Sequence, residues 1–323
     1  NEGPLGTQFT DSVPAWRFVG EACVVDIRDL LDIAPKGISS LVQIEHVKRW
    51  EAKHRPLGAG DVALLRSDYS DLYYKPLPAG RRFISEPLEK KAPGWPDPHP
   101  DAMEYMALKG VTAVGTDSPS MGPIPDLAEP THYAGLKHGL VFTEGATRLS
   151  QLPEVGSFYC FAGPRHALGP YGEGRAFAIK PGPLANWLLQ AAREKNVTDL
   201  SVVLSTDLPV TWTGFGVGNH RHPYTKADFL YSETLDLYHH THLMDSHAGT
   251  HLVPPSYALP TRGFSNREYA PAIRSWLREY ERDFGRRGFS SVTTEQVGLD
   301  QTCGWARVID VKSLINTTSP GDW

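Results

Sequence analysis

The sequence predicts an α/β fold, in which buried strands alternate with helices. Apolar, β-branched runs predict strands at 22–27, 61–67 and 111–115. Apolar residues at helical spacing predict a helix over 41–56, and a second helix is expected over 101–109. Because strands and helices alternate along the chain, we expect mixed sheets flanked by helices.

The composition is that of a globular protein and excludes several classes of partner. The chain has 323 residues, of which 40% are hydrophobic and 21% charged, so it can bury a sizeable core. A net charge of −5 gives no reason to expect nucleic acid or an anionic membrane as a partner. No apolar run is long enough to span a membrane. A reducing, cytoplasmic location is expected because the cysteines lack disulfide spacing; they are Cys23, Cys160 and Cys303.

Two features concern the organisation of the chain. Residues 75–100 hold seven prolines, which predicts a long covering loop rather than a core element. The chain does not begin with Met, so we expect a fragment or a processed chain.

A histidine-rich segment, residues 239–260, carries the clearest chemical signal. Five of the chain's 13 histidines lie in its first 13 residues. At its centre the run HAGTH places His247 and His251 four residues apart, and Gly-Thr between them with Pro254 and Pro255 beyond favours a tight turn over a helix. Imidazole is the commonest protein ligand for a borderline ion such as zinc, so the segment predicts a metal site. A solvated loop, or histidines hydrogen-bonded to backbone, is the alternative.

This segment resembles the HxGTHxDxPxH signature of the cyclase family of metal-dependent hydrolases, which includes kynurenine formamidase and isatin hydrolase. In that family the first two histidines and the aspartate bind metal, and the last histidine serves in catalysis. The resemblance implies that His247 and His251 are metal ligands, and Pro255 matches the proline. Val253 stands at the aspartate position and Tyr257 at the final histidine. Tyr257 is therefore expected to orient the substrate carbonyl.

Residues 1–18 resemble a second, diverged copy of the same signature. Gly6-Thr7 matches its GT pair, and Gln8 stands at the second histidine. Asp11 or Thr10 falls near the aspartate position. Because glutamine is a poor zinc ligand but an acceptable oxygen donor to Mn or Mg, Gln8 and Asp11 join the candidate metal ligands. A surface loop punctuated by Pro and Gly is the alternative.

The resemblance also singles out His132 and, twelve residues later, Glu144. The family carries a His and a Glu at this spacing, and they complete its metal site. His132 and Glu144 are therefore expected metal ligands, and Glu144 or Asp245 is expected to hold the metal or take a proton. Asp117 and Ser118 follow a predicted strand, where ligands gather in open α/β layers, so they are plausible pocket residues.

The chain also indicates an internal duplication. Residues 24–31 (VVDIRDLL) and 308–315 (VIDVKSLI) align without a gap, and both are expected to contribute a strand. The resemblance implies that residues 1–182 are the latter two-thirds of one cyclase-family domain, with its swivelling β/β/α-type fold, and that 183–323 are the first half of another. Either the two parts complete one permuted unit that unites all four His and Glu candidates, or a second chain or missing segments complete each.

The expected function is metal-dependent hydrolysis of a C–N or C–O bond in an amide, cyclic amide or ester of a small molecule. A divalent metal, Zn or Mn, would lower the pKa of bound water from about 15.7 to about 7 and polarise the carbonyl. Loss of the aspartate at Val253 argues for one ion rather than two. A homo-oligomer, or completion by another chain, is expected.

Two other functions stay open. Gln8, Val253 and Tyr257 make both copies of the signature degenerate, which favours a non-catalytic subunit or scaffold that keeps the fold. A lyase or cyclase acting on a small carboxylated ring is the third possibility.

Overall fold

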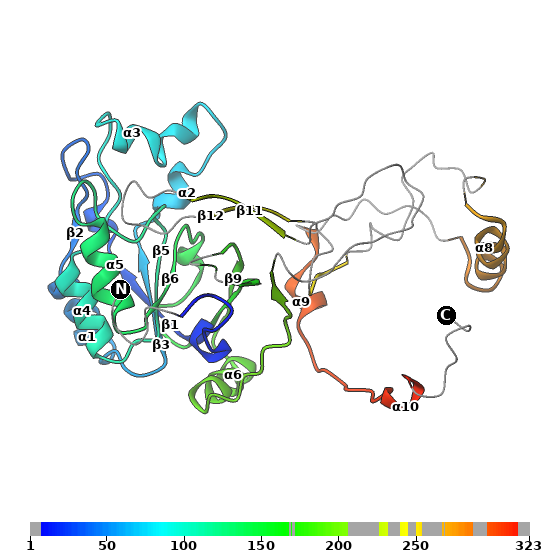
Figure 1. The fold of residues 1–323 in the computed structure, drawn as a ribbon. Helices are drawn as coiled ribbons and strands as arrows, with labels where there is room; N and C mark the ends of the chain where they lie inside the picture. Colours follow the sequence, from blue (N-terminus) through cyan, green and yellow to red (C-terminus); the bar gives the residue numbers. More distant parts are fainter. Residues whose placement is uncertain are drawn as a thin grey trace. The chain divides into compact units, whose positions relative to one another are not determined.

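The computed structural model divides the chain into two compact units, Asn1–Thr250 and His251–Trp323 (Figure 1). The residues that it describes are 8–167, 169, 172–205, 226–231, 240–244, 250–253, 267, 269–286 and 296–315. None of the described helices is long and apolar enough to cross a membrane. The domain division at residue 182 stays a prediction.

A six-stranded mixed sheet forms the centre of the first unit (Figure 1). Its strands are β1 (Val19–Asp26), β3 (Asp61–Arg66), β5 (Ala113–Thr116), β6 (Val141–Thr143), β7 (Ser157–Ala162) and β9 (Arg175–Ile179). They lie in the order β6-β5-β3-β1-β7-β9. The strands β1, β3, β5 and β6 run parallel, whereas β7 is antiparallel to β1 and β9 to β7. The three strands that the sequence predicts are thus confirmed as β1, β3 and β5, and the mixed α/β class is confirmed with them.

Three helices cover one face of this sheet: α1 (Ile44–Lys53), α4 (Pro100–Leu108) and α5 (Ala128–Leu136). Val25 of β1 and Trp50 of α1 belong to the same buried cluster as Met103 and Met106 of α4. The two predicted helices are confirmed as α1 and α4. The first begins later than predicted, because the residues before it form the short strand β2 (Leu41–Val42), which pairs with β4 (Asp97–Pro98).

The opposite face of the sheet is also buried, which explains why β1 and β3 are apolar almost throughout. Val24 and Leu64 pack there with Leu149 and Tyr159. At the antiparallel end, α6 (Pro183–Arg193) packs its Leu189 into a cluster of its own with Val19 and Phe158.

Short elements make up the connections of the first unit. They are η1 (Ala15–Phe18), η2 (Arg28–Leu30), α2 (Tyr69–Tyr73), η3 (Ala79–Arg82), α3 (Ser85–Leu88), η4 (Leu149–Gln151), β8 (Arg165–His166) and β10 (Val203–Leu204), with the hairpin of β11 (Lys226–Tyr231) and β12 (His240–Met244). The proline-rich segment 75–100 is not only a covering loop: it holds η3, α3 and the buried strand β4.

The second unit contains α8 (Pro271–Phe284), α9 (Leu299–Thr302) and α10 (Lys312–Ile315). Residues 306–311, the counterpart of β1 in the expected duplication, form no strand. Val308 is 96% exposed and Ile309 80%, so the prediction of a buried strand there is wrong. An apolar run forms a strand only where a neighbouring strand satisfies its backbone groups, and none pairs with these residues in the described part of the chain.

Candidate functional site

Buried polar side chains gather where the parallel strands β3, β5 and β6 end. Asp117, directly after β5, is 1% exposed and holds the residues that follow β3. Its carboxylate accepts hydrogen bonds from the Ser67 hydroxyl (2.5 Å) and from the backbone N–H groups of Ser67 (2.9 Å) and Asp68 (2.6 Å). Burial raises the pKa of Asp117 to about 6, against the pull of these hydrogen bonds. Asp117 therefore fixes two adjacent strand ends.

A second buried carboxyl, Asp97 of β4, holds the turn that follows β5. It accepts hydrogen bonds from the hydroxyls of Thr116 (3.1 Å) and Ser118 (3.0 Å) and from the N–H of Gly122 (2.9 Å). Asp97 is fully buried, and its burial raises its pKa well above the ordinary value. Sequence reasoning misses this residue because it lies in the proline-rich segment.

The pair His132 and Glu144 stands at the end of β6. His132 comes from α5 and Glu144 directly follows β6, and the His132 Nε2 atom lies 3.4 Å from the Glu144 Oε1 atom. The same oxygen accepts the N–H of Met121 (2.7 Å). Because a carbonyl can only accept, the His132 Nδ1 atom carries a proton and donates it to the Ala128 carbonyl oxygen (2.8 Å).

Two effects act on the pKa of His132. Burial by itself would lower it, but the hydrogen bonds to Glu144 and to the Ala128 carbonyl outweigh burial, so the pKa lies above its ordinary value. The side chains remain 25% and 36% exposed for His132 and Glu144, respectively, so a small molecule can reach them.

The His132–Glu144 pair fits two ligands of one divalent cation. Metal-binding histidines usually donate the second ring N–H to a carbonyl or carboxylate, and ligating carboxylates are themselves hydrogen-bonded. Both features are present here. Two ligands about 2.1 Å from a tetrahedral ion stand about 3.4 Å apart, which agrees with the separation of the Nε2 and Oε1 atoms.

Three other sequence candidates, Gln8, Asp11 and His251, lie among the described residues. Gln8 is exposed, and the carbonyl of Asp11 accepts a hydrogen bond from Arg165 (2.8 Å). His251 is exposed and belongs to the second unit. Within the described ranges no group of three or more His, Cys, Asp or Glu side chains could hold a metal ion. The candidates that lie outside the described residues are Asp245, His247 and Tyr257.

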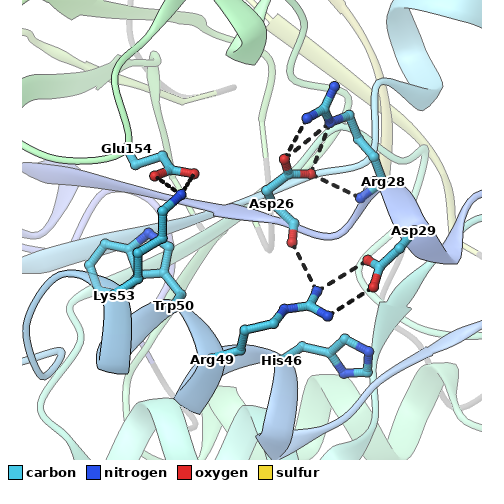
Figure 2. Close-up of a pocket in the computed structure, with 8 residues that line it drawn as sticks. All are labelled: Asp26, Arg28, Asp29, His46, Arg49, Trp50, Lys53 and Glu154. Carbon is cyan, nitrogen blue, oxygen red and sulfur yellow. Dashed lines mark hydrogen bonds and ion pairs between the residues drawn. The ribbon is translucent and has the colours of Figure 1, made fainter.

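A surface pocket with a volume of about 380 Å³ opens at the end of β1 (Figure 2). It is lined by Asp26, Arg28, Asp29, His46, Arg49, Trp50, Lys53 and Glu154. Its cations are paired within the pocket: Arg28 with Asp26, Arg49 with Asp29, and Lys53 with Glu154. Two strands separate β1 from β6, and three spacings of about 4.8 Å place their ends about 14 Å apart. The pocket is therefore distinct from the His132–Glu144 pair.

Together, the sheet and this pair define an α/β protein with a candidate metal centre at the carboxyl ends of its parallel strands. Residues 3–123 match the model of the cyclase family, described as "Putative cyclase". This part of the chain is therefore similar to the cyclase family, whose signature the sequence also resembles.

Two curated relatives resemble the chain over part of its length. The isatin hydrolase of Roseibium aggregatum is 26% identical over 178 residues, which cover 54% of this chain and 64% of that protein. The kynurenine formamidase of Salinibacter ruber is 37% identical over 142 residues, which cover 43% and 52%. The chain thus spans less than two thirds of the length of either relative.

Two solved structures are also similar to the chain, each over somewhat more than half of its length. An isatin hydrolase bound to the product analogue thioisatinate has a TM-score of 0.45 and 22% identity, with 56% of this chain and 66% of that chain covered. A potential metal-dependent hydrolase with cyclase activity has a TM-score of 0.39 and 20% identity, with 53% and 69% covered.

Proposed function

We propose that this chain belongs to a metal-dependent hydrolase that cleaves an amide, cyclic amide or ester bond of a small molecule. The His132–Glu144 pair is the observation that carries the proposal. An imidazole whose Nδ1–H donates to the Ala128 carbonyl faces a carboxylate at the carboxyl ends of parallel strands. The relatives named isatin hydrolase and kynurenine formamidase support a substrate with a cyclic amide or formamide group.

In this proposal the chain's own residues hold and orient the metal. His132 presents its Nε2 atom because the Ala128 carbonyl fixes its tautomer, and Glu144 presents a carboxylate steadied by the Met121 N–H. A divalent ion, Zn or Mn, supplies Lewis acidity that activates water and polarises the substrate carbonyl. Further ligands are needed, and the sequence candidates for them remain proposals: Gln8, Asp11, His247 and His251, with Asp245 and Tyr257 for catalysis.

Metal binding tests the proposal directly. After treatment with EDTA, the chain is titrated with Mn²⁺ and with Zn²⁺ by calorimetry and assayed for hydrolysis of isatin and of the formamide of kynurenine. We expect stoichiometric binding that His132→Ala weakens strongly. His138→Ala is the matched control, because His138 also contacts a glutamate, Glu104, at 2.6 Å from the same region of the chain. Equal metal affinity in both variants and the wild type would overturn the assignment of His132.

A non-catalytic subunit is the second candidate. Gln8 and Val253 replace two ligands of the family signature, and the described residues supply a pair rather than a triad of ligands. A subunit of this kind would bind no metal, so EDTA would leave its thermal unfolding unchanged. The hydrolase requires ligands beyond the His132–Glu144 pair, and another chain could supply them. Sedimentation with and without Mn²⁺ would detect a second chain.

A further inference from the structure

The turn after β5 connects Asp97 to both members of the His132–Glu144 pair. Two consecutive backbone N–H groups of this turn point to two different carboxyls: that of Met121 to Glu144 (2.7 Å) and that of Gly122 to Asp97 (2.9 Å). A shift of the Gly122 peptide would therefore move the hydrogen bond that steadies Glu144.

The same turn also packs against the backbone of Ala128, the residue whose carbonyl oxygen orients the His132 ring. A Cβ atom on Gly122 would stand 2.5 Å from the Cα atom of Ala128 and 2.9 Å from its carbonyl oxygen. That oxygen accepts the Nδ1 proton of His132. The close approach requires glycine at this position. The Gly122 peptide, which Asp97 holds, therefore packs directly against Ala128, which orients the imidazole.

We propose that Asp97 is a positioning residue that fixes the turn 116–122 and thereby sets the relative geometry of Glu144 and His132. The inference rests on the proposed function, in which these two side chains hold a metal ion. Burying a carboxyl completely is costly unless its hydrogen bonds are made. The Asp97 carboxyl makes all of its described hydrogen bonds to this one turn, through Thr116, Ser118 and Gly122.

The test compares Asp97→Asn with Asp61→Asn in the full chain. Asparagine keeps the shape of the side chain but turns one acceptor into a donor, so it cannot accept all three hydrogen bonds at position 97. Asp61 is the matched control, because it is also a buried carboxyl, but it lies at the start of β3 and its side chain bonds to Arg55 and to the Gly58 N–H.

Two measurements are made on each variant. The first is the amide proton shift of Met121 in the metal-free protein, which reports the short hydrogen bond to Glu144. The second is the Mn²⁺ affinity by calorimetry. We expect Asp97→Asn to move the Met121 resonance upfield and to weaken Mn²⁺ binding by about 10- to 100-fold, the usual effect of losing an outer-shell partner. Asp61→Asn should leave both at wild-type values.

The outcomes separate this inference from the proposed function. An unmoved Met121 amide in Asp97→Asn, or equal changes in both variants, overturns the positioning role whether or not metal binds. A wild-type protein that binds no Mn²⁺ or Zn²⁺ overturns the proposed function, while the Met121 shift still decides the positioning role. If Asp97→Asn does not fold, Ser118→Ala removes the hydroxyl that bridges both Asp97 oxygens and should move the Met121 amide in the same direction.

Discussion

Replacement of Arg55 by methionine should cost much of the stability of the first unit. The Arg55 guanidinium contacts the Asp61 carboxylate through two hydrogen bonds, of 2.6 and 2.9 Å, and bridges to Glu21 at 3.0 Å. Asp61 is 4% exposed. Without Arg55, the Asp61 carboxylate keeps one described hydrogen bond, which it accepts from the Gly58 N–H. Glu21 keeps its ion pair with Arg193.

The magnitude follows from the charge that remains buried. Removing one partner of a buried ion pair costs about 3–5 kcal/mol. The side chain of Arg55 is itself 36% exposed, so we expect the lower end, about 3 kcal/mol. The Asp61→Asn, Arg55→Met double variant should lose less than the sum of the single variants, because no buried charge is then left without its partner.

Arg28→Met is the matched comparison for Arg55→Met. Arg28 also forms a bidentate ion pair with an aspartate, Asp26, but the side chains of Arg28 and Asp26 are 50% and 33% exposed. An exposed pair contributes about 0–1 kcal/mol. Urea unfolding at pH 7, followed by circular dichroism, gives the free energy of unfolding of each variant. Losses of the same size for Arg55→Met and Arg28→Met would refute the argument from burial.

Three further predictions concern the carboxyl edge of the sheet. Burial raises the pKa of Asp117 from 3.8 to about 6, so the native state binds more protons than the unfolded state between these pH values. The contribution of Asp117 to stability should therefore fall by about 2.4 kcal/mol as the pH rises from 4 to 7, and a urea series that shows the same slope in Asp117→Asn would contradict this. Gly122→Ala should cost about 1–3 kcal/mol because its Cβ meets Ala128, whereas Gly58→Ala, with open space around its Cβ, should cost under about 0.5 kcal/mol in the same assay. Mn²⁺ at 100 times its dissociation constant should stabilise the EDTA-treated protein by about 2.7 kcal/mol; a melting curve that Mn²⁺ does not shift would count against a metal centre.

The central strands could be predicted from the sequence because their signal is local. The run 22–25 of β1 is apolar at every position, as expected of a parallel strand covered on both faces. The same reasoning fails at Val308, where a similar run is exposed. The two runs differ in their available partners, because β1 is hydrogen-bonded on both sides, by β3 and β7. The residues of a strand do not by themselves determine which strands pair with it.

The candidate site was predictable only in part. The helix α5 buries small residues such as Ala134 and Gly135, so it lacks the large apolar stripe that indicates an amphipathic helix. His132 is found through the family resemblance instead. Asp97 carries no signal at all, because its role depends on the pairing of β4 with β2 and on hydroxyls that lie about twenty residues further along the chain.

The central place of β1 also constrains the biosynthesis of this protein. One side of β1 pairs with β3, which follows soon after it, but the other side pairs with β7, at the far end of the sheet-forming sequence. On the ribosome, one edge of β1 therefore stays without its partner until residues 157–162 have emerged. Polypeptides that terminate before this point expose a row of unsatisfied amide and carbonyl groups, which is a template for intermolecular pairing. Prematurely terminated chains should consequently be aggregation-prone substrates for chaperones and proteases.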